Sequence, residues 1–331
     1  MILEKNEQER RWRLRVAGAR DEKLYIGPEI VHLHITNRCN LRCRYCWHHS
    51  PGNPELAHPA QDLPFRKFCA ILKDCRTLKV NNLYISGEGE PTLHPRFAQM
   101  MDLAEQYPLA VTVFSNATFP SSLLPALLKA DHLVVDLSAP DAADYQIIHG
   151  ADHFNRVVNN IKALSQMRKD LGKHLSITGR CVMNRINQPR LHEISGLMRS
   201  IGVDSIELVP MQPTPFNRDI AIKPKDPLPH GPKKGPECNR CFNGWFYLSA
   251  RLNGQMSYCC RVPQINTGHL YRSSLKTAWG SKKFMALRVL GKTSQINKKF
   301  KECAECHYKR QNIAVLLELA RMKRITPRKS P

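Results

Sequence analysis

Cys39, Cys43 and Cys46 form a compact group, with three residues between the first two cysteines and two between the last two. Thiolates are soft ligands that prefer zinc or iron–sulfur clusters to hard cations. A closed structural metal site normally has four protein ligands, whereas this run provides three and would leave one metal of a four-iron cluster open for chemistry. His48 and His49 follow the run and could instead complete a zinc knuckle. The spacing therefore predicts a metal centre and leaves zinc and iron open.

The position of these cysteines favours an active site. Residues 31–35 alternate between apolar and polar side chains and predict a strand, and the cysteines lie in the loop that follows it. In a β/α barrel, the loops that follow the strands gather at the face where active sites are found. We therefore expect the metal centre to lie beyond the C-terminal end of the first strand of such a fold.

Further strands and helices alternate along the chain. Strands are predicted at residues 83–85, 111–114, 133–138, 176–182 and 205–208, and helices at segments such as 156–171 and 191–201. Six strand–helix units predict an α/β fold with a partial (β/α)6 TIM-like barrel over residues 28–210. A basic extension over residues 1–27 precedes the barrel, and a proline-rich linker or substrate loop over residues 211–236 follows it.

A second group of cysteines predicts a small C-terminal domain over residues 237–310, followed by a basic helix and tail over residues 311–331. The group consists of Cys238, Cys241, Cys259, Cys260, Cys303 and Cys306. Asn253-Gly254 lies between two β-prone runs and predicts a hairpin with positive φ at both turn residues. The hairpin would bring Cys241 and Cys259 together, and Cys303 and Cys306 form a C-x2-C pair. Four thiolates can enclose a metal completely, as a zinc ribbon or as an iron–sulfur site.

The two cysteine groups, together with the run Ser86-Gly87-Glu88-Gly89-Glu90-Pro91, resemble radical SAM enzymes with a C-terminal SPASM or Twitch extension. The resemblance implies that Cys39, Cys43 and Cys46 hold a [4Fe-4S] cluster whose fourth iron binds S-adenosyl-L-methionine (SAM). An electron from a donor such as flavodoxin or ferredoxin then cleaves SAM to a 5′-deoxyadenosyl radical, which abstracts hydrogen from the substrate. It also implies a barrel that is open on one side.

The resemblance also assigns residues to SAM, which are Tyr45, Gly87, Gly89, Glu90, Ser115, Asn116 and Ser138. Glycines allow a close approach of the backbone, and Glu90 would engage the methionine ammonium. Glu88 departs from the pattern, because the family usually has glycine at this position. At Ser115 and Ser138 a second interpretation stays open, since a polar residue at a strand end is often a helix cap.

For the C-terminal domain, the resemblance implies one auxiliary [4Fe-4S] cluster, as in the shorter Twitch form. Its expected ligands are Cys241, Cys259, Cys303 and Cys306. Cys238 and Cys260 are left over, and either could replace one of these ligands. Cys181 lies in the fifth predicted strand, and some relatives that invert stereocentres use a thiol to return a hydrogen atom to the substrate radical. A buried apolar role for Cys181 is the other interpretation.

Composition bounds the compartment and the partners. The chain has 331 residues and 12 cysteines, most of them at metal-ligand spacings, which favours the cytoplasm over a secreted disulfide framework. No segment has the character of a transmembrane helix or a secretory signal. The net charge of +22 favours an anionic small-molecule or peptide substrate and leaves nucleic acid open. Residues 11–16 alternate basic and apolar side chains and predict an edge strand or a nucleic-acid contact.

The expected function is a radical SAM oxidoreductase in which the auxiliary cluster takes an electron from the product radical. The outcome would be a two-electron oxidation or a cross-link. One alternative is a radical SAM epimerase with Cys181 as the hydrogen donor. Another is a zinc-dependent nucleic-acid-binding protein, against which Gly89-Glu90-Pro91 argues because a zinc module does not need this stretch.

Overall fold

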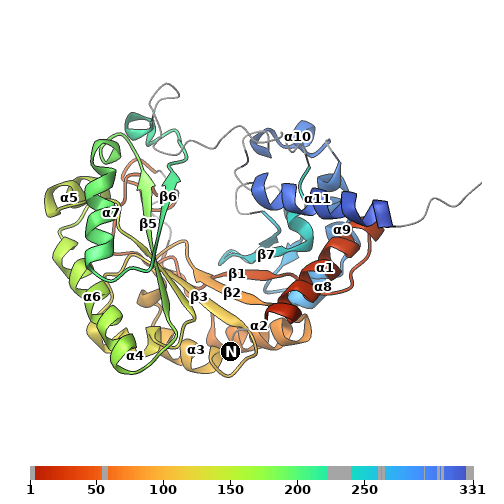
Figure 1. The fold of residues 1–331 in the computed structure, drawn as a ribbon, viewed down its shortest axis with the longest axis horizontal. Helices are drawn as coiled ribbons and strands as arrows, with labels where there is room; N and C mark the ends of the chain where they lie inside the picture. The colour runs from red at the N-terminus through yellow and green to blue at the C-terminus, as the bar shows by residue number, and fades with distance from the viewer. Residues whose placement is uncertain are drawn as a thin grey trace, which may run out of the picture. The chain divides into compact units, whose positions relative to one another are not determined.

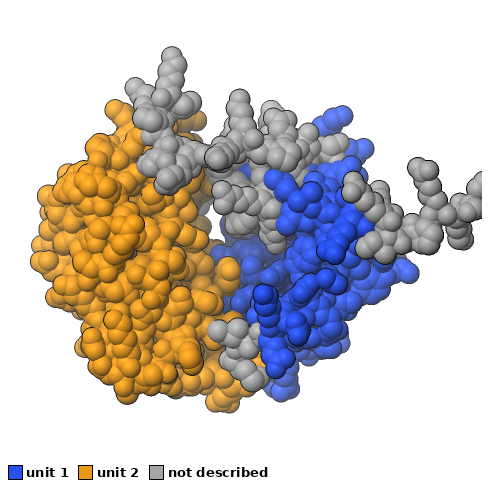
Figure 2. All heavy atoms as spheres, in the orientation of Figure 1, with its two compact units in different colours: residues 1–32, 69–83, 229–331 blue, residues 33–68, 84–228 orange. Residues whose placement is uncertain are grey.

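The computed structural model describes residues 4–53, 59–222, 240–259, 262, 265–293, 295–303, 306 and 309–325 (Figure 1). The chain divides into two compact units (Figure 2). Unit 1 comprises residues 1–32, 69–83 and 229–331, and unit 2 comprises residues 33–68 and 84–228. Three of the four boundaries fall within strands β1 (Ile30–His34) and β2 (Asn82–Ser86) and helix α2 (Phe65–Thr77), and the fourth lies outside the described residues.

Parallel strands in chain order make up the sheet of unit 2. Strands β3 (Ala110–Ser115), β4 (His132–Asp136), β5 (Ser176–Met183) and β6 (Ser205–Pro210) pair in parallel, and β2 and β1 follow beside β3. The six strands predicted from the sequence are confirmed, and so is the α/β class. In the described part of the chain β6 is an edge of the sheet, as expected for a barrel that is only partial.

Helices connect these strands and lie along one face of the sheet (Figure 1). They are α3 (Phe97–Ala104), α4 (Leu124–Leu127), α5 (Ala142–His149), α6 (Phe154–Asp170) and α7 (Leu191–Ser200). A Cβ added to Gly179 in β5 would lie 2.6 Å from Met198 Sδ in α7, so this face of β5 packs on the helix layer. Because side chains alternate along a strand, Thr178 and Arg180 point to the opposite face of the sheet.

A buried arginine holds the end of α6 against the sheet. The guanidinium of Arg168 donates to Asp204 Oδ1 (2.8 Å) and to the carbonyl oxygens of Leu175 (2.6 Å) and Gly202 (3.0 Å). Asp204 Oδ2 also accepts the backbone N–H of Ile177 at the start of β5 (2.7 Å). The hydrogen bond from Arg168 lowers the pKa of Asp204, so the carboxylate is the form that stabilises the fold.

Asp204→Asn should lower the free energy of unfolding by about 1–2 kcal/mol, because it leaves a buried guanidinium without its anion. The half-exposed carboxylate limits the loss. Chemical denaturation of anaerobically reconstituted protein at pH 7 measures the change. Asp102→Asn is the matched control, since Asp102 pairs with Lys129 at the surface (2.7 Å), and it should change the free energy by no more than about 0.5 kcal/mol. Equal losses in both variants would contradict the prediction.

Unit 1 contains an antiparallel hairpin. Strands β7 (Tyr247–Ala250) and β8 (Gln255–Ser257) pair antiparallel, and β9 (Gly268–His269) pairs with β8. The predicted hairpin is confirmed, but positive φ occurs only at Gly254 (87°) and not at Asn253 as well. The turn is longer than a two-residue turn, and Asn253 Oδ1 accepts the backbone N–H of Gln255 (2.9 Å). The Asn side chain thus caps the turn, so its own backbone does not need the left-handed region.

Residues 11–16 lie in helix α1 (Lys5–Asp21), so the predicted edge strand was wrong. Arg11 Nε donates to Glu7 Oε1 one turn earlier (2.7 Å), an ion pair that supports a helix. Arg15 is buried and donates to the carbonyl oxygens of Gly27 (3.0 Å) and Pro28 (3.1 Å). The arginines at positions 11 and 15 are therefore used within unit 1.

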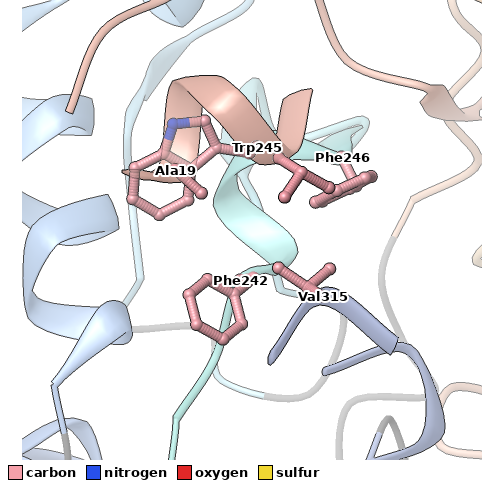
Figure 3. Close-up of a cluster of buried hydrophobic side chains, with 6 residues drawn as sticks. Ala19, Phe242, Trp245, Phe246 and Val315 are labelled. Atoms are coloured by element: carbon pink, nitrogen blue, oxygen red, sulfur yellow. The ribbon is translucent and has the colours of Figure 1, made fainter. Parts of the chain in front are cut away.

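Helices α1 and α11 (Lys309–Ile325) pack on the residues just before β7 (Figure 3). The buried cluster consists of Val16, Ala19, Phe242, Trp245, Phe246 and Val315. Gly18 faces Trp245 closely, because a Cβ there would lie 3.3 Å from Trp245 Cδ1 and 2.7 Å from the carbonyl oxygen of Lys23. The other helices of unit 1 are α8 (Leu275–Trp279), α9 (Lys282–Lys292) and α10 (Gln295–Lys299). No helix in the described ranges is long and apolar enough to cross a membrane.

Candidate active site

The loop of Cys39, Cys43 and Cys46 follows β1 and is held at the C-terminal end of α5. The backbone N–H groups of Arg42 and Arg44 donate to the carbonyl oxygens of His149 (3.0 Å) and Ile148 (2.9 Å). These carbonyls belong to the last turn of the helix, where no backbone N–H of the helix itself can reach them. The helix end therefore fixes the path of the cysteine loop.

His149 connects this loop to the end of β4. Its ring is buried, and Cys43 Sγ lies 3.2 Å from Nδ1. The backbone N–H of Ser138 donates to Nε2 (3.3 Å), which makes Nε2 the acceptor and places the remaining proton on Nδ1. Burial lowers the pKa of His149 to about 3, so the ring is neutral. The Nδ1–H group then points at the sulfur of Cys43.

The three thiols of the loop influence one another. The pKa of Cys39 is raised to about 12, mainly by burial and in smaller part by negative charge on Glu90 and Cys46. Burial likewise raises the pKa of Cys43, to which both other thiols add. Cys46 Sγ accepts the backbone N–H groups of His48 (3.4 Å) and His49 (3.2 Å). Three neighbouring, partly buried thiols without a fourth thiol in the loop suit three corners of a four-iron cluster.

Of the two histidines that could complete a zinc knuckle, His49 is engaged elsewhere. His49 Nε2 donates to the carbonyl oxygen of Glu88 (2.8 Å), which ties the cysteine loop to the glycine-rich run after β2. Among the residues that the structure describes, no three His, Cys, Asp or Glu side chains are arranged so as to hold a single metal ion. The side chain of Glu88 lies 3.7 Å from His34 Nδ1 at the end of β1.

Gly87 and Gly89 are required by close packing of the chain on itself. A Cβ on Gly89 would lie 2.2 Å from the carbonyl oxygen of Arg38, and one on Gly87 would lie 2.5 Å from the carbonyl oxygen of Gly89. The backbone N–H of Glu90 donates to the carbonyl oxygen of Arg38 (2.7 Å). The glycine-rich run is thereby locked onto the residue just before Cys39.

The carboxylate of Glu90 is buried and joins this run to the end of β3. Oε1 accepts the backbone N–H (3.1 Å) and hydroxyl (2.7 Å) of Thr92 and the hydroxyl of Ser115 (2.9 Å). Oε2 accepts the backbone N–H of Asn116 (2.7 Å). Burial raises the pKa of Glu90, and these bonds oppose the rise. Oε2 keeps a lone pair for a further donor.

Two polar residues that the sequence did not single out complete this network. Asn40, inside the cysteine run, accepts from Asn116 Nδ2 at its Oδ1 (3.0 Å) and donates through its Nδ2 to Thr118 Oγ1 (2.8 Å). The position of Asn40 between two proposed cysteine ligands was a signal that could have identified it. Thr118 gave none, because a threonine after a strand is common in any fold.

Asp136, Ser138 and Tyr45 form a second polar group at the end of β4. Ser138 Oγ donates to Asp136 Oδ1 (2.8 Å) and accepts the backbone N–H of Val182 (2.9 Å). Burial raises the pKa of Asp136, and hydrogen bonds from Ser138 and Tyr45 oppose the rise. Asp136 and His149 were both missed, although Asp136 ends a strand whose alternate residues face the side opposite the helices.

Cys181 lies on the face of β5 that carries Gly179 and packs on the helix layer. The thiol is fully buried, and burial raises its pKa to about 12. Asn187 Nδ2 donates to its sulfur (3.6 Å). This placement favours a packing role over one as a hydrogen donor.

The four thiols expected to bind an auxiliary cluster come together in unit 1. Burial raises the pKa of Cys241, and negative charge on Cys259, Cys306 or Cys303 raises it further. The backbone N–H of Cys241 donates to the carbonyl oxygen of Gly291 in α9 (2.6 Å). The two remaining candidates, Cys238 and Cys260, lie outside the described residues.

Comparison with known families and structures agrees with these two sites. A model of the radical SAM superfamily matches residues 33–187, and a model of the SPASM iron–sulfur cluster-binding domain matches residues 241–307. Streptococcus suis SuiB bound to S-adenosylmethionine superposes with a TM-score of 0.64 at 15% identity, over 87% of this chain and 74% of that one. For anSMEcpe with bound AdoMet the TM-score is 0.59 at 15% identity, over 85% and 84%. At such identities the likeness shows the fold.

Curated relatives match part of the chain. The tungsten-containing aldehyde ferredoxin oxidoreductase cofactor-modifying protein of Pyrococcus furiosus is 28% identical over 56% of this chain and 53% of its own length. A probable GTP 3′,8-cyclase of Saccharolobus islandicus is 24% identical over 60% and 62%. The match thus spans less than two thirds of either relative. With both family models and both thiol groups in place, the chain belongs to the radical SAM superfamily and carries a SPASM domain, so that its cofactors are a [4Fe-4S] cluster, SAM and auxiliary iron–sulfur.

Proposed function

We propose that this chain is a radical SAM oxidoreductase that removes two electrons from its substrate, by forming either a double bond or a cross-link. The observation that carries the proposal is the second group of partly buried thiols, in unit 1, in addition to the three in unit 2. The cluster and SAM of unit 2 supply a 5′-deoxyadenosyl radical when bound. The substrate would lose one hydrogen atom to this radical, a proton to solvent and one electron to the auxiliary cluster.

Within unit 2, the proposed ligands of the SAM cluster are Cys39, Cys43 and Cys46. Glu90 would bind the methionine ammonium through the lone pair that Oε2 keeps, because its other acceptor positions are filled by the chain. Asn40 and Asn116 hold the cysteine loop and the end of β3 together. These contacts would orient SAM, and none of them needs to move when SAM binds.

An anionic small molecule or peptide is the proposed substrate. On the face of the sheet opposite the helices, the guanidinium of Arg180 lies 5.1 Å from the centroid of the Phe114 ring and pairs with Glu207 (2.8 Å). A planar cation on an aromatic face can receive a carboxylate or a phosphate. Among similar proteins, SuiB binds the precursor peptide SuiA and the Pyrococcus furiosus protein is named for modifying a cofactor, so both classes have precedents.

The compartment and the electron donor belong to the same proposal. The proposed compartment is the reducing cytoplasm, where thiols such as those of the described cysteines stay free. A flavodoxin or ferredoxin would deliver the electron to the SAM cluster. The family matches argue against the zinc-dependent nucleic-acid-binding alternative, and the placement of Cys181 argues against the epimerase.

Metal analysis tests the cofactor sites. Anaerobically reconstituted protein should contain about eight iron atoms and about eight acid-labile sulfides per chain, because two four-iron clusters are expected. Replacing the three thiols of unit 2 by Ala should leave about four of each, and so should replacing Cys303 and Cys306. Cys75→Ala, a buried thiol of α2 outside both groups, should keep about eight. Zinc in place of iron would contradict the proposal.

Product analysis tests the electron acceptor. The double variant Cys303→Ala, Cys306→Ala should still form 5′-deoxyadenosine from SAM, since the cluster of unit 2 is intact, but should form no oxidised product. Both are measured by mass spectrometry after turnover with dithionite. The Cys75→Ala variant should form both products. A full yield of oxidised product in the double variant would rule out the proposed role of the auxiliary cluster.

A redox titration tests the contact between His149 and Cys43. His149→Leu removes the N–H group that points at the sulfur, and donors to cluster sulfur favour the reduced cluster. The midpoint potential of the SAM cluster should therefore become more negative, as followed by electron paramagnetic resonance. Tyr145→Phe keeps the ring that stacks on His149 (4.2 Å between centroids) and should leave the potential unchanged. Equal shifts would mean that packing alone is responsible.

A further inference from the structure

Arg288 in α9 is a buried cation with no anion hydrogen-bonded to it among the residues that the structure describes. Only 1% of the residue is exposed. Nε donates to the carbonyl oxygen of Gly244 (2.7 Å), but neither terminal nitrogen of the guanidinium has a hydrogen-bond partner in the structure as described. A charged group that is removed from water is normally paired with an opposite charge or neutralised by hydrogen bonds. The guanidinium of Arg288 has five N–H donors, of which one makes a hydrogen bond in the structure as described.

Aromatic rings surround the guanidinium. Its carbon lies 3.7 Å from the centroid of the Phe284 ring and 4.1 Å from that of Trp279. Such contacts are attractive, but they do not replace the hydration of a full charge. Burial lowers the pKa of Arg288 to about 9, which is still above neutral pH, so the side chain is charged in the cell. The positive charge therefore has a cost that no hydrogen-bonded carboxylate in the described ranges offsets.

The segments that pack on Arg288 carry two of the proposed ligands of the auxiliary cluster. Gly244, which accepts its Nε–H, lies three residues after Cys241. Gly291, in the same helix, accepts the N–H of Cys241 (2.6 Å) and has no room for a side chain, because a Cβ would lie 2.6 Å from the carbonyl oxygen of Cys241. Cys241 is thus fastened to α9 less than one turn from Arg288.

The second connection runs through Tyr258, the neighbour of Cys259. Its hydroxyl donates to the carbonyl oxygen of Leu287 (3.1 Å), and its ring stacks on Phe284 with 5.7 Å between centroids. Phe284 is also one of the rings that contact the guanidinium, so Arg288 is connected through Phe284 and Tyr258 to the backbone next to Cys259.

We propose that Arg288 is the internal counter-charge of the auxiliary cluster and sets its reduction potential. A four-iron cluster with four thiolate ligands is a net anion, and a positive charge held nearby in a medium of low dielectric favours the form with one more electron. Arg288 acts through the field at the cluster and touches no substrate, so it is a positioning residue. The inference rests on the ligand set proposed above, and it would suit a cluster that accepts an electron.

The test uses the full-length chain with Cys39, Cys43 and Cys46 replaced by Ala, so that the auxiliary cluster alone gives a signal. Midpoint potentials are measured by titration followed by electron paramagnetic resonance in this background. Arg288→Gln removes the charge and keeps a donor for the carbonyl oxygen of Gly244, whereas Arg288→Lys keeps the charge. Lys283→Gln is the control, because Lys283 is an exposed cation of the same helix.

Arg288→Gln should shift the midpoint potential to more negative values, and raised salt should not remove the shift, because a buried charge is poorly screened. Arg288→Lys and Lys283→Gln should remain near the parent value. Iron and sulfide are measured in the same samples. Cluster loss in Arg288→Gln with retention in Arg288→Lys also supports the counter-charge. Equal shifts or equal cluster loss in both Arg288 variants, or an unchanged potential in Arg288→Gln, would overturn it. A parent without iron would instead disprove the ligand set.

Discussion

The buried carboxylate of Glu90 is the interaction on which the arrangement of the active site depends. A charge away from water persists only where hydrogen bonds replace its hydration, and Glu90 takes these bonds from Thr92, Ser115 and Asn116. The glycine-rich run and the end of β3 must therefore meet at a fixed distance. Asn40 extends the same network into the cysteine loop. The positions of three segments that come from separate strands are thus coupled through one side chain.

A second constraint holds the cysteine loop from the other side. The C-terminal carbonyls of α5 accept its backbone N–H groups, and the ring of His149 lies between Cys43 and Ser138. On the side of α5, the proposed cluster therefore faces buried groups whose proton positions are fixed. Such an environment shapes the electronic properties of a metal centre as much as its ligands do. In unit 1, α9 has the role that α5 has in unit 2. It accepts the backbone N–H of Cys241, and it carries the buried cation Arg288.

The sequence predicted most of what depends on local pattern. Alternating apolar and polar residues located the six strands, and Asn253-Gly254 located the hairpin. The strand predicted for residues 11–16 was wrong although their alternation fits a strand. The ion pair that supports a helix there involves Glu7, which lies outside these residues. His149 could not be predicted from the sequence, because it is 106 residues from Cys43 along the chain and resembles any histidine at a helix end. The sequence could not predict which face of β5 carries Cys181. The structure shows it through the contact of Gly179, on the same face, with Met198.

The docking of the cysteine loop on α5 has a consequence for how the protein matures. The two backbone hydrogen bonds that dock the loop on α5 come from Arg42 and Arg44, and neither involves a cysteine sulfur. The loop can therefore take its shape before iron arrives, in contrast to zinc fingers, whose ligands order only around the metal. Loss and repair of the cluster after exposure to oxygen could then proceed without refolding of the chain.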